Sequence, residues 1–254
     1  MKIGKNTYIS PSAKITTISN KFSIDDFEIG DNSYIGDDVQ IICNKFSLGD
    51  YCKIHHHTNI HGDSVKIGHN AWIGQYSIID GLGGTSIGNN CGIGAHSQLW
   101  SHIKYGDTLE GCRFLSKSNL KIGNDVWLVG HCIVSPVTIS DKSMALVGSV
   151  ITKDMEYNNI YAGSPAKNIT NKVGKQFKEV SIEEKMLKMN DYLSEFGLSG
   201  KIKIVQDVSF FKNDENTYFA VKTREYTKKL SEEEILFMKF LLPNKAKFIP
   251  HDTI

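Results

Sequence analysis

The sequence predicts an all-β solenoid, a parallel β-helix built from six-residue repeats, followed by a small α+β tail. Three observations support this prediction. An aliphatic residue recurs every six positions, glycine often follows it, and a small residue often stands four positions after it. Beyond about residue 169 the period of six stops, and helical spacing replaces it.

The aliphatic repeat comes in groups of three, one group for each expected coil. A period of six fits neither an amphipathic helix nor a strand of an open sheet. It fits a coil of three short strands whose inward residues stack on the next coil. Because coils repeat at ~4.8 Å, six or seven of them give a prism of roughly 30 Å. Glycine and asparagine are expected at the corners, where positive φ favours them. The repeated positions are Ile3 and Ile9; Ile29, Ile35 and Ile41; Leu48, Ile54 and Ile60; Ile67, Ile73 and Ile79; Ile87, Ile93 and Leu99; Ile122, Leu128 and Val134; and Ile139, Ala145 and Ile151.

Three irregularities interrupt the repeat. The period fails over Trp100–Leu120, and it loses one residue between Val134 and Ile139. The non-periodic stretch Thr16–Phe27 is expected to be a smaller excursion. Solenoids tolerate insertions where loops leave the prism, and such loops often carry the binding face. The segment Trp100–Leu120 is therefore the first place to look for chemistry.

The last part of the chain predicts a separate α+β domain over residues 170–254, after a β-helix domain over residues 1–169. Apolar residues at helical spacing follow Ser181, whose partner Glu184 completes a capping box, and Gly197 ends that helix. Two strands are expected over Lys201–Phe211 and Thr217–Lys228, and a second helix from Ser231 to before Pro243. We expect this domain to cap the open end of the solenoid or to support an oligomer. Acceptor recognition is the alternative.

Composition restricts the classes of partner. The 254 residues have a formal net charge of +1 and no dense basic stretch, so no nucleic-acid partner is expected. No apolar run approaches the ~18 residues of a membrane span, and the first residues lack the apolar region of a secretion signal. The five cysteines are scattered without a C-x-x-C pair. Reduced thiols in a cytoplasmic protein are the simplest interpretation.

Three motifs resemble one family. They are I-G-A-H-S-Q-L-W-S-H (Ile93–His102), K-I-G-N-D-V-W-L-V-G (Lys121–Gly130) and the closing run from Gly148 to Lys167. With the repeat, they resemble the hexapeptide-repeat acetyltransferases, especially those that O-acetylate sugars. The resemblance implies a left-handed β-helix, a homotrimer with each active site between two prisms, acetyl-CoA as donor substrate, and no metal.

The resemblance also implies roles for individual residues. His102 matches the catalytic histidine, and Trp127 matches the tryptophan that follows it. Gly130 and Val147 match positions whose backbone amides hold the pantetheine arm, and Lys153 and Lys167 match basic positions near the CoA phosphates. The chain departs from the galactoside-type subgroup at Ile103, where that subgroup has proline, and at Leu128-Val129, where it has I-G. The acceptor therefore stays open.

The chemistry of acetyl transfer needs a proton acceptor. A sugar hydroxyl is a poor nucleophile, and a neutral imidazole can take its proton and then return it to the thiolate, a contribution of about 10²–10⁴-fold. A backbone amide or water would stabilise the oxyanion. His102 is the expected general base, with His96 as its rival. Asp80 or Glu110 would bind the acceptor or orient the histidine, while Asp107 and Trp100 are weaker candidates. The alternatives are a surface histidine and a corner aspartate.

The leading prediction is an acetyl-CoA-dependent O-acetyltransferase acting on a sugar or glycan hydroxyl. One alternative is an N-acetyltransferase of an amino sugar. Another is a γ-class carbonic anhydrase-like zinc enzyme, since His61, His96 and His102 are spaced roughly as its ligands. A non-catalytic scaffold is the third. The run His55-His56-His57 is expected to be stacked surface residues, and Gly81–Gly84 lacks the G-K-[S/T] of a phosphate loop.

Overall fold

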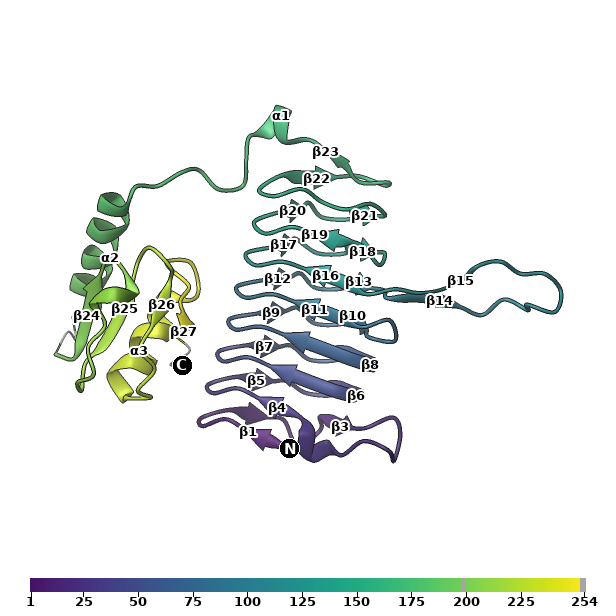
Figure 1. Cartoon of the computed structure of the whole chain (residues 1–254), viewed down its shortest axis with the longest axis horizontal. Coiled ribbons are helices and arrows are strands. Elements are labelled where there is room, and N and C mark those ends of the chain that lie inside the picture. The colour runs from purple at the N-terminus through teal and green to yellow at the C-terminus, as the bar shows by residue number, and fades with distance from the viewer. Residues whose placement is uncertain (198–199, 252–254) are drawn as a thin grey trace. The chain divides into compact units, whose positions relative to one another are not determined.

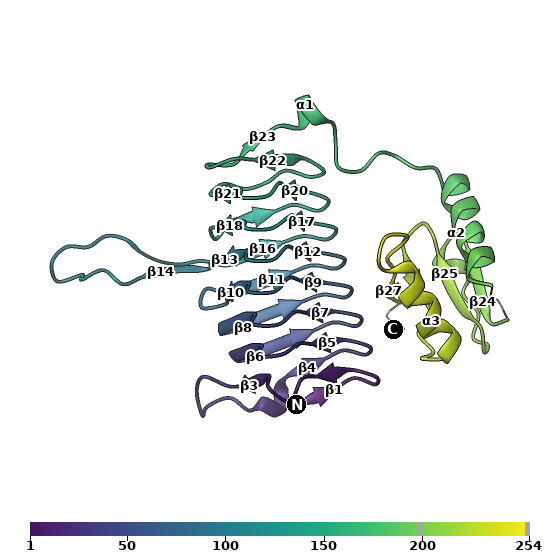
Figure 2. The same cartoon turned by 180° about the vertical axis from the view of Figure 1, so that it is seen from behind.

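The computed structural model describes residues 1–197 and 200–251. Contacts within the chain divide it into two compact units, Met1–Phe177 and Lys178–Ile254. The first unit is a prism of stacked coils, whose strands form successive rungs in Figure 1 and, from behind, in Figure 2. The second unit contains a four-stranded sheet and two helices.

The strands of the prism lie on three faces, and nearly all neighbours along each face pair in parallel. The first and third faces belong to one sheet, because β6 and β8 each run along the third face, turn a corner and continue on the first. The first face holds β1 (Lys2–Ile3), β4 (Glu28–Ile29), the ends of β6 (Gln40–Leu48) and β8 (Asn59–Ile67), β11 (Thr85–Ile87), β16 (Leu120–Ile122) and β19 (Thr138–Ile139). The second face holds β2 (Tyr8–Ile9), β5 (Tyr34–Ile35), β7 (Lys53–Ile54), β9 (Trp72–Ile73), β12 (Gly92–Ile93), β17 (Trp127–Leu128), β20 (Met144–Ala145), β22 (Ile160–Ala162) and β23 (Lys167–Asn168). The third face holds β3 (Lys14–Thr16), the starts of β6 and β8, β10 (Ile78–Asp80), β13 (Gln98–Leu99), β18 (Ile133–Val134) and β21 (Val150–Ile151).

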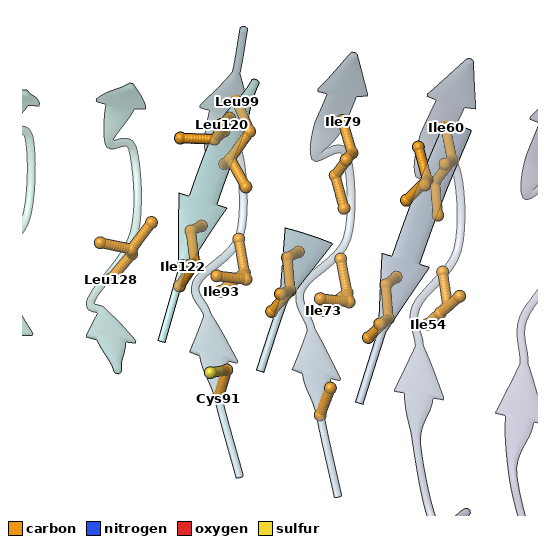
Figure 3. Packing of buried hydrophobic residues seen from close by; sticks show 14 of the residues in the cluster. Ile54, Ile60, Ile73, Ile79, Cys91, Ile93, Leu99, Leu120, Ile122 and Leu128 are labelled. Atoms are coloured by element: carbon orange, nitrogen blue, oxygen red, sulfur yellow. The ribbon is translucent and has the colours of Figure 1, made fainter. Parts of the chain in front are cut away.

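The core is the set of aliphatic columns that the repeat predicts. On the second face Ile54, Ile73, Ile93 and Leu128 occupy the same register on successive strands, and all are fully buried. Figure 3 shows these side chains pointing into the prism in line with one another. The expected stacking is confirmed from Ile29 onward, whereas Ile3 is half exposed because it lies on the terminal coil, where β1 pairs only with β4.

The corners differ from the sequence prediction in one respect. The glycines that follow the aliphatic residues do not have positive φ; the residue two positions later does, as at Asn32, Asn70 and Asn90. A side chain at Gly88 would place its Cβ 2.6 Å from the carbonyl oxygen of Gly123 on the next coil. These glycines are needed because adjacent coils approach too closely for a Cβ, while asparagine supplies the left-handed turn.

The irregular segments leave the prism as expected. Within Trp100–Leu120, strands β14 (His102–Lys104) and β15 (Leu115–Lys117) form an antiparallel hairpin. Figures 1 and 2 both show it projecting away from the stacked coils. The excursion at Thr16–Phe27 contains a short 3-10 helix, Ile24–Asp26. After the coils, α1 (Thr170–Val173) adds one turn.

The second unit confirms both helices and corrects both strands. Helix α2 (Ile182–Phe196) has the Ser181–Glu184 capping box and ends at Gly197, and α3 (Glu232–Leu241) begins after Ser231. The first expected strand ends early, because Asp207 caps a 3-10 helix at Val208–Phe210. The second is broken by a turn in which Arg224 has φ +58°. The observed strands are β24 (Ile202–Val205), β25 (Thr217–Ala220), β26 (Glu225–Tyr226) and β27 (Ile249–Pro250).

Two further observations concern the whole chain. In the part that the structure describes, no helix is long and apolar enough to cross a membrane. The five cysteines are free thiols, and four of them are buried. Burial raises the pKa of Cys52 to about 12, so this thiol stays protonated and unreactive at neutral pH.

Candidate active site

His102 lies where the hairpin leaves the prism. It is the first residue of β14, directly after Ser101 at the end of a third-face coil, and it pairs with Lys117 on β15. On the coil below, β10 ends at Asp80. The coil register therefore brings a carboxyl group from one coil beneath an imidazole at the start of the insertion, although 22 positions separate them.

Asp80 is the centre of the hydrogen-bond network at this corner. Its side chain is 0% exposed. One carboxylate oxygen, Oδ2, accepts hydrogen bonds from the Ser101 amide at 2.8 Å, the Ser101 hydroxyl at 2.6 Å and His102 Nδ1 at 2.7 Å. The other oxygen, Oδ1, accepts from the Leu82 amide at 3.2 Å. A buried carboxylate is stable only when it is this fully satisfied.

The electrostatic balance keeps Asp80 ionised. Burial is the largest single influence and raises the pKa of the carboxyl group. Hydrogen bonds from His102, Ser101 and the backbone together outweigh burial, so the pKa of Asp80 is lowered. An ionised Asp80 fixes the proton of His102 on Nδ1 and leaves the lone pair of Nε2 available. The His102 side chain keeps 20% of its surface exposed at this edge of the prism.

Sequence reasoning missed two neighbours of Asp80 as supporting residues. Ser101 supplies two of its hydrogen bonds. His61, directly below Asp80 in register on β8, places Nε2 3.5 Å from Asp80 Oδ1, while its Nδ1 lies 2.8 Å from Asn59 Oδ1. The coil repeat could have identified His61, because it stands one coil, or 19 positions, before Asp80. A second link holds the hairpin base, where Lys117 forms an ion pair with Asp63.

The other acid–base candidates lie elsewhere. The His96 ring stacks between Tyr76 and His131 at a different corner, and the described residues show no contact between it and Asp80. Glu110 is exposed in the hairpin loop, where its amide donates to Asp107. Trp100 approaches His102 edge-on, with ring centroids 6.5 Å apart. The structure therefore brings Asp80 to His102 but does not bring His96 or Glu110 there.

The residues expected at the donor site lie on or just after strands of the second face, and in the last coils of the prism. Trp127 is 47% exposed and lies over Gly92, where an added Cβ would be 3.1 Å from the Trp127 ring. Gly130 and Val147 follow the second-face strands β17 and β20, and Val147 is 65% exposed. Lys153 and Lys167 are exposed in the last coils. Four of the five positions are therefore exposed, whereas Gly130 is buried.

The structure shows how the His55-His56-His57 run packs and whether histidines gather as a zinc site would require. His55 packs against Trp72, and His56 and His57 contact Tyr76, as expected for stacked surface residues. Over residues 1–197 and 200–251, no group of three or more histidine, cysteine or acidic side chains is arranged to hold a metal ion.

Comparison with known proteins gives sequence relatives and fold relatives. No protein-family model matches the chain. The galactoside O-acetyltransferase of Escherichia coli K12 is 35% identical over 74 residues, which are 29% of this chain and 32% of that protein. The chain thus matches about a third of the length of this relative. A protein named for colanic acid biosynthesis acetyltransferase activity, WcaF of the same organism, is 27% identical over 173 residues, 68% of this chain and 70% of that protein.

Over the matched residues the chain is similar in sequence to these acetyltransferases. Among solved structures, a point mutant of AntD, an N-acyltransferase from Bacillus cereus, aligns with a TM-score of 0.52 at 18% identity. That alignment covers 76% of this chain and 91% of the AntD chain, which was crystallised with a dTDP-amino sugar and coenzyme A. The likeness concerns the fold and confirms a left-handed β-helix, the handedness that the family resemblance implies.

Proposed function

We propose that the chain is an acetyl-CoA-dependent O-acetyltransferase that acts on a sugar or glycan hydroxyl, with His102 as general base. The observation that supports this most directly is the 2.7 Å contact between His102 Nδ1 and the buried Asp80 carboxylate. A base oriented by a fixed carboxylate at an exposed edge is the arrangement that proton transfer from a substrate requires.

The proposed reaction needs no covalent enzyme intermediate. The acceptor hydroxyl oxygen attacks the carbonyl carbon of the thioester while its proton moves to His102 Nε2. The tetrahedral intermediate collapses by breaking the carbon–sulfur bond, and His102 returns the proton to the departing thiolate of CoA. Asp80 stabilises the transient imidazolium through the Nδ1 hydrogen bond. A backbone amide or water would stabilise the oxyanion.

We further propose a homotrimer in which acetyl-CoA lies between prisms. Trp127, Gly130 and Val147 would contact the donor, and Lys153 and Lys167 would pair with its phosphates. The support is the exposure of Trp127, Val147, Lys153 and Lys167 together with the sequence similarity to an acetyltransferase. In the same arrangement the hairpin residues, including the fully exposed Tyr105, would contact a neighbouring subunit.

The test replaces His102 with alanine and measures turnover separately from donor binding. We expect acetyl transfer to fall by about 10²–10⁴-fold, because the base is lost, while the affinity for acetyl-CoA stays within about twofold. The matched control is His57→Ala. It removes an exposed histidine for which the described residues show no contact with Asp80. Near-normal turnover in His102→Ala would reject the assignment.

The acceptor is identified with a panel of sugars analysed by mass spectrometry. Hydroxyl and amino acceptors are incubated in parallel with enzyme and acetyl-CoA, and each product is treated with mild alkali. An ester releases acetate under this treatment and an amide does not. Products that resist alkali would replace O-acetylation with acetylation of an amino sugar.

A further inference from the structure

A column of stacked rings runs along one corner of the prism. The proposed role of His102 as general base does not explain it. His57, Tyr76, His96 and His131, here called the ring column, follow the second-face strands on four successive coils, each with φ between +50° and +59°. Successive ring centroids lie 4.9, 5.1 and 4.8 Å apart, with interplanar angles of 22°, 8° and 11°. Such φ values are uncommon for tyrosine and histidine. Their recurrence makes this corner a built stacking surface.

Backbone hydrogen bonds show which residue comes next in the column. The amide of each corner residue donates to the carbonyl just before the corner residue of the preceding coil. His96 donates to Gln75 at 3.0 Å and His131 to Ala95 at 2.9 Å. By the same rule Gly148 donates to Gly130 at 3.0 Å, so Gly148 occupies the corner above His131. Gly148 also shares the left-handed conformation, with φ +72°.

The column therefore ends at a position without a side chain. A Cβ built on Gly148 would meet no atom within 4 Å. Among the described residues, His131 has one ring partner, His96, so its ring is stacked on one face. We call the position above the other face the slot: the His131 imidazole lies beneath it, and Gly148 leaves it without a side chain. One coil repeat is ~4.8 Å, a spacing that suits a single flat group at this position.

We propose that this slot binds a flat, delocalised group of coenzyme A, either an amide of the pantetheine arm or the adenine ring, stacked on His131. The inference rests on the proposed function for the identity of the donor. The chain neighbours of the slot are Gly130 and Val147, and the exposed Lys153 and Lys167 lie on the coils beyond it. A planar group of CoA placed there continues the column as its next layer, with the ring geometry that favours offset stacking.

The test measures binding of free CoA by calorimetry, without an acceptor and without turnover. His131→Ala removes the floor of the slot, and we expect CoA to bind about three- to tenfold more weakly. Gly148→His fills the slot with one more ring of the column, and we expect a loss of about tenfold or more. Histidine already adopts this backbone conformation at three corners, so the fold should be retained, which circular dichroism checks.

Controls and partial ligands complete the experiment. His57→Ala changes the far end of the column and should leave the affinity for CoA unchanged. Pantetheine and 3′,5′-ADP, titrated separately, show which half of CoA occupies the slot, since only that half should lose affinity in both slot variants. Unchanged CoA affinity in folded His131→Ala and Gly148→His would overturn the proposal. Failure of the wild-type protein to bind CoA at all would instead reject the proposed donor.

Discussion

Asp80 shows at the scale of one residue how the fold stabilises a buried charge at the proposed active site. The carboxylate is buried, yet two side chains and two backbone amides satisfy it. Hydrogen bonds to a charged group contribute about 1.5–3 kcal/mol each when the alternative is an unsatisfied partner. Asp80 therefore stabilises the corner as well as orienting His102.

The lowered pKa of Asp80 predicts a specific dependence of stability on pH. The unfolded carboxyl group takes up its proton near pH ~3.9, and the folded one does so at lower pH. The stabilisation is therefore fully present above about pH 4 and is lost as the pH falls through the folded pKa. We expect Asp80→Asn to lower the free energy of unfolding by about 2 kcal/mol near neutral pH.

The measurement is urea unfolding of both proteins from pH 7 to pH 3. The gap between wild type and Asp80→Asn should narrow at the acid end, because only the wild type loses the charged contact there. A gap that is constant across this range, or that widens in acid, would contradict the lowered pKa.

The sequence was informative about the catalytic residues to the extent that the repeat locates them. His102 stands out because it lies at the start of the segment where the period fails, and Asp80 because it lies one coil earlier. The supporting roles of Ser101 and His61 were missed because they depend on which neighbour each side chain meets across coils. The ring column was missed because positive φ at tyrosine and histidine has no sequence signal comparable to that of glycine or asparagine.

The hairpin β14–β15 is the element on which the proposed site depends. Its base is held by the His102–Asp80 contact and by the Lys117–Asp63 ion pair. Its loop exposes large apolar side chains, with Leu109 at 92% and Phe114 at 73% exposure. Apolar groups this exposed point to a partner surface. The sequence located the insertion. Its antiparallel pairing could not be derived, because the segment shows no alternation of apolar and polar residues.

Shortening the hairpin tests whether that partner is another copy of the chain. We expect replacement of residues 105–114 by Asn-Gly to leave the unfolding midpoint nearly unchanged, because the removed side chains are outside the core. The same variant should lose the proposed trimer and most of the turnover. Light scattering coupled to size exclusion measures the mass, and a variant that stays trimeric would show that the loop does not hold the subunits together.

At the scale of the whole molecule, the chain is two units with separate cores. The repeat predicted the first unit almost completely, because each coil obeys the same spacing and contacts only its neighbours. The second unit was predicted less well. Its helices have capping residues that are visible in the sequence. Its short strands end at turns at Asp207 and Arg224, and the pattern of apolar and polar residues does not predict these turns.

Limited proteolysis should separate the two units. The segment from Gly174 to Val180 has no helix or strand, and Lys175 and Lys178 are exposed in it. We expect trypsin to cut there first and to release a β-helical fragment that keeps its strand spectrum by circular dichroism. Intact-mass analysis of the time course identifies the site, and early cuts within the coils would contradict two separately stable units.

The position of His102 at the root of the hairpin also bears on how such proteins diverge. Asp80 belongs to the coils and His102 to the first pair of the hairpin, while residues 105–114 beyond them bury nothing in the prism. Natural selection can therefore lengthen, shorten or change the tip without disturbing the proposed proton acceptor. Relatives that share the same chemistry are free to acquire new acceptors through that one excursion.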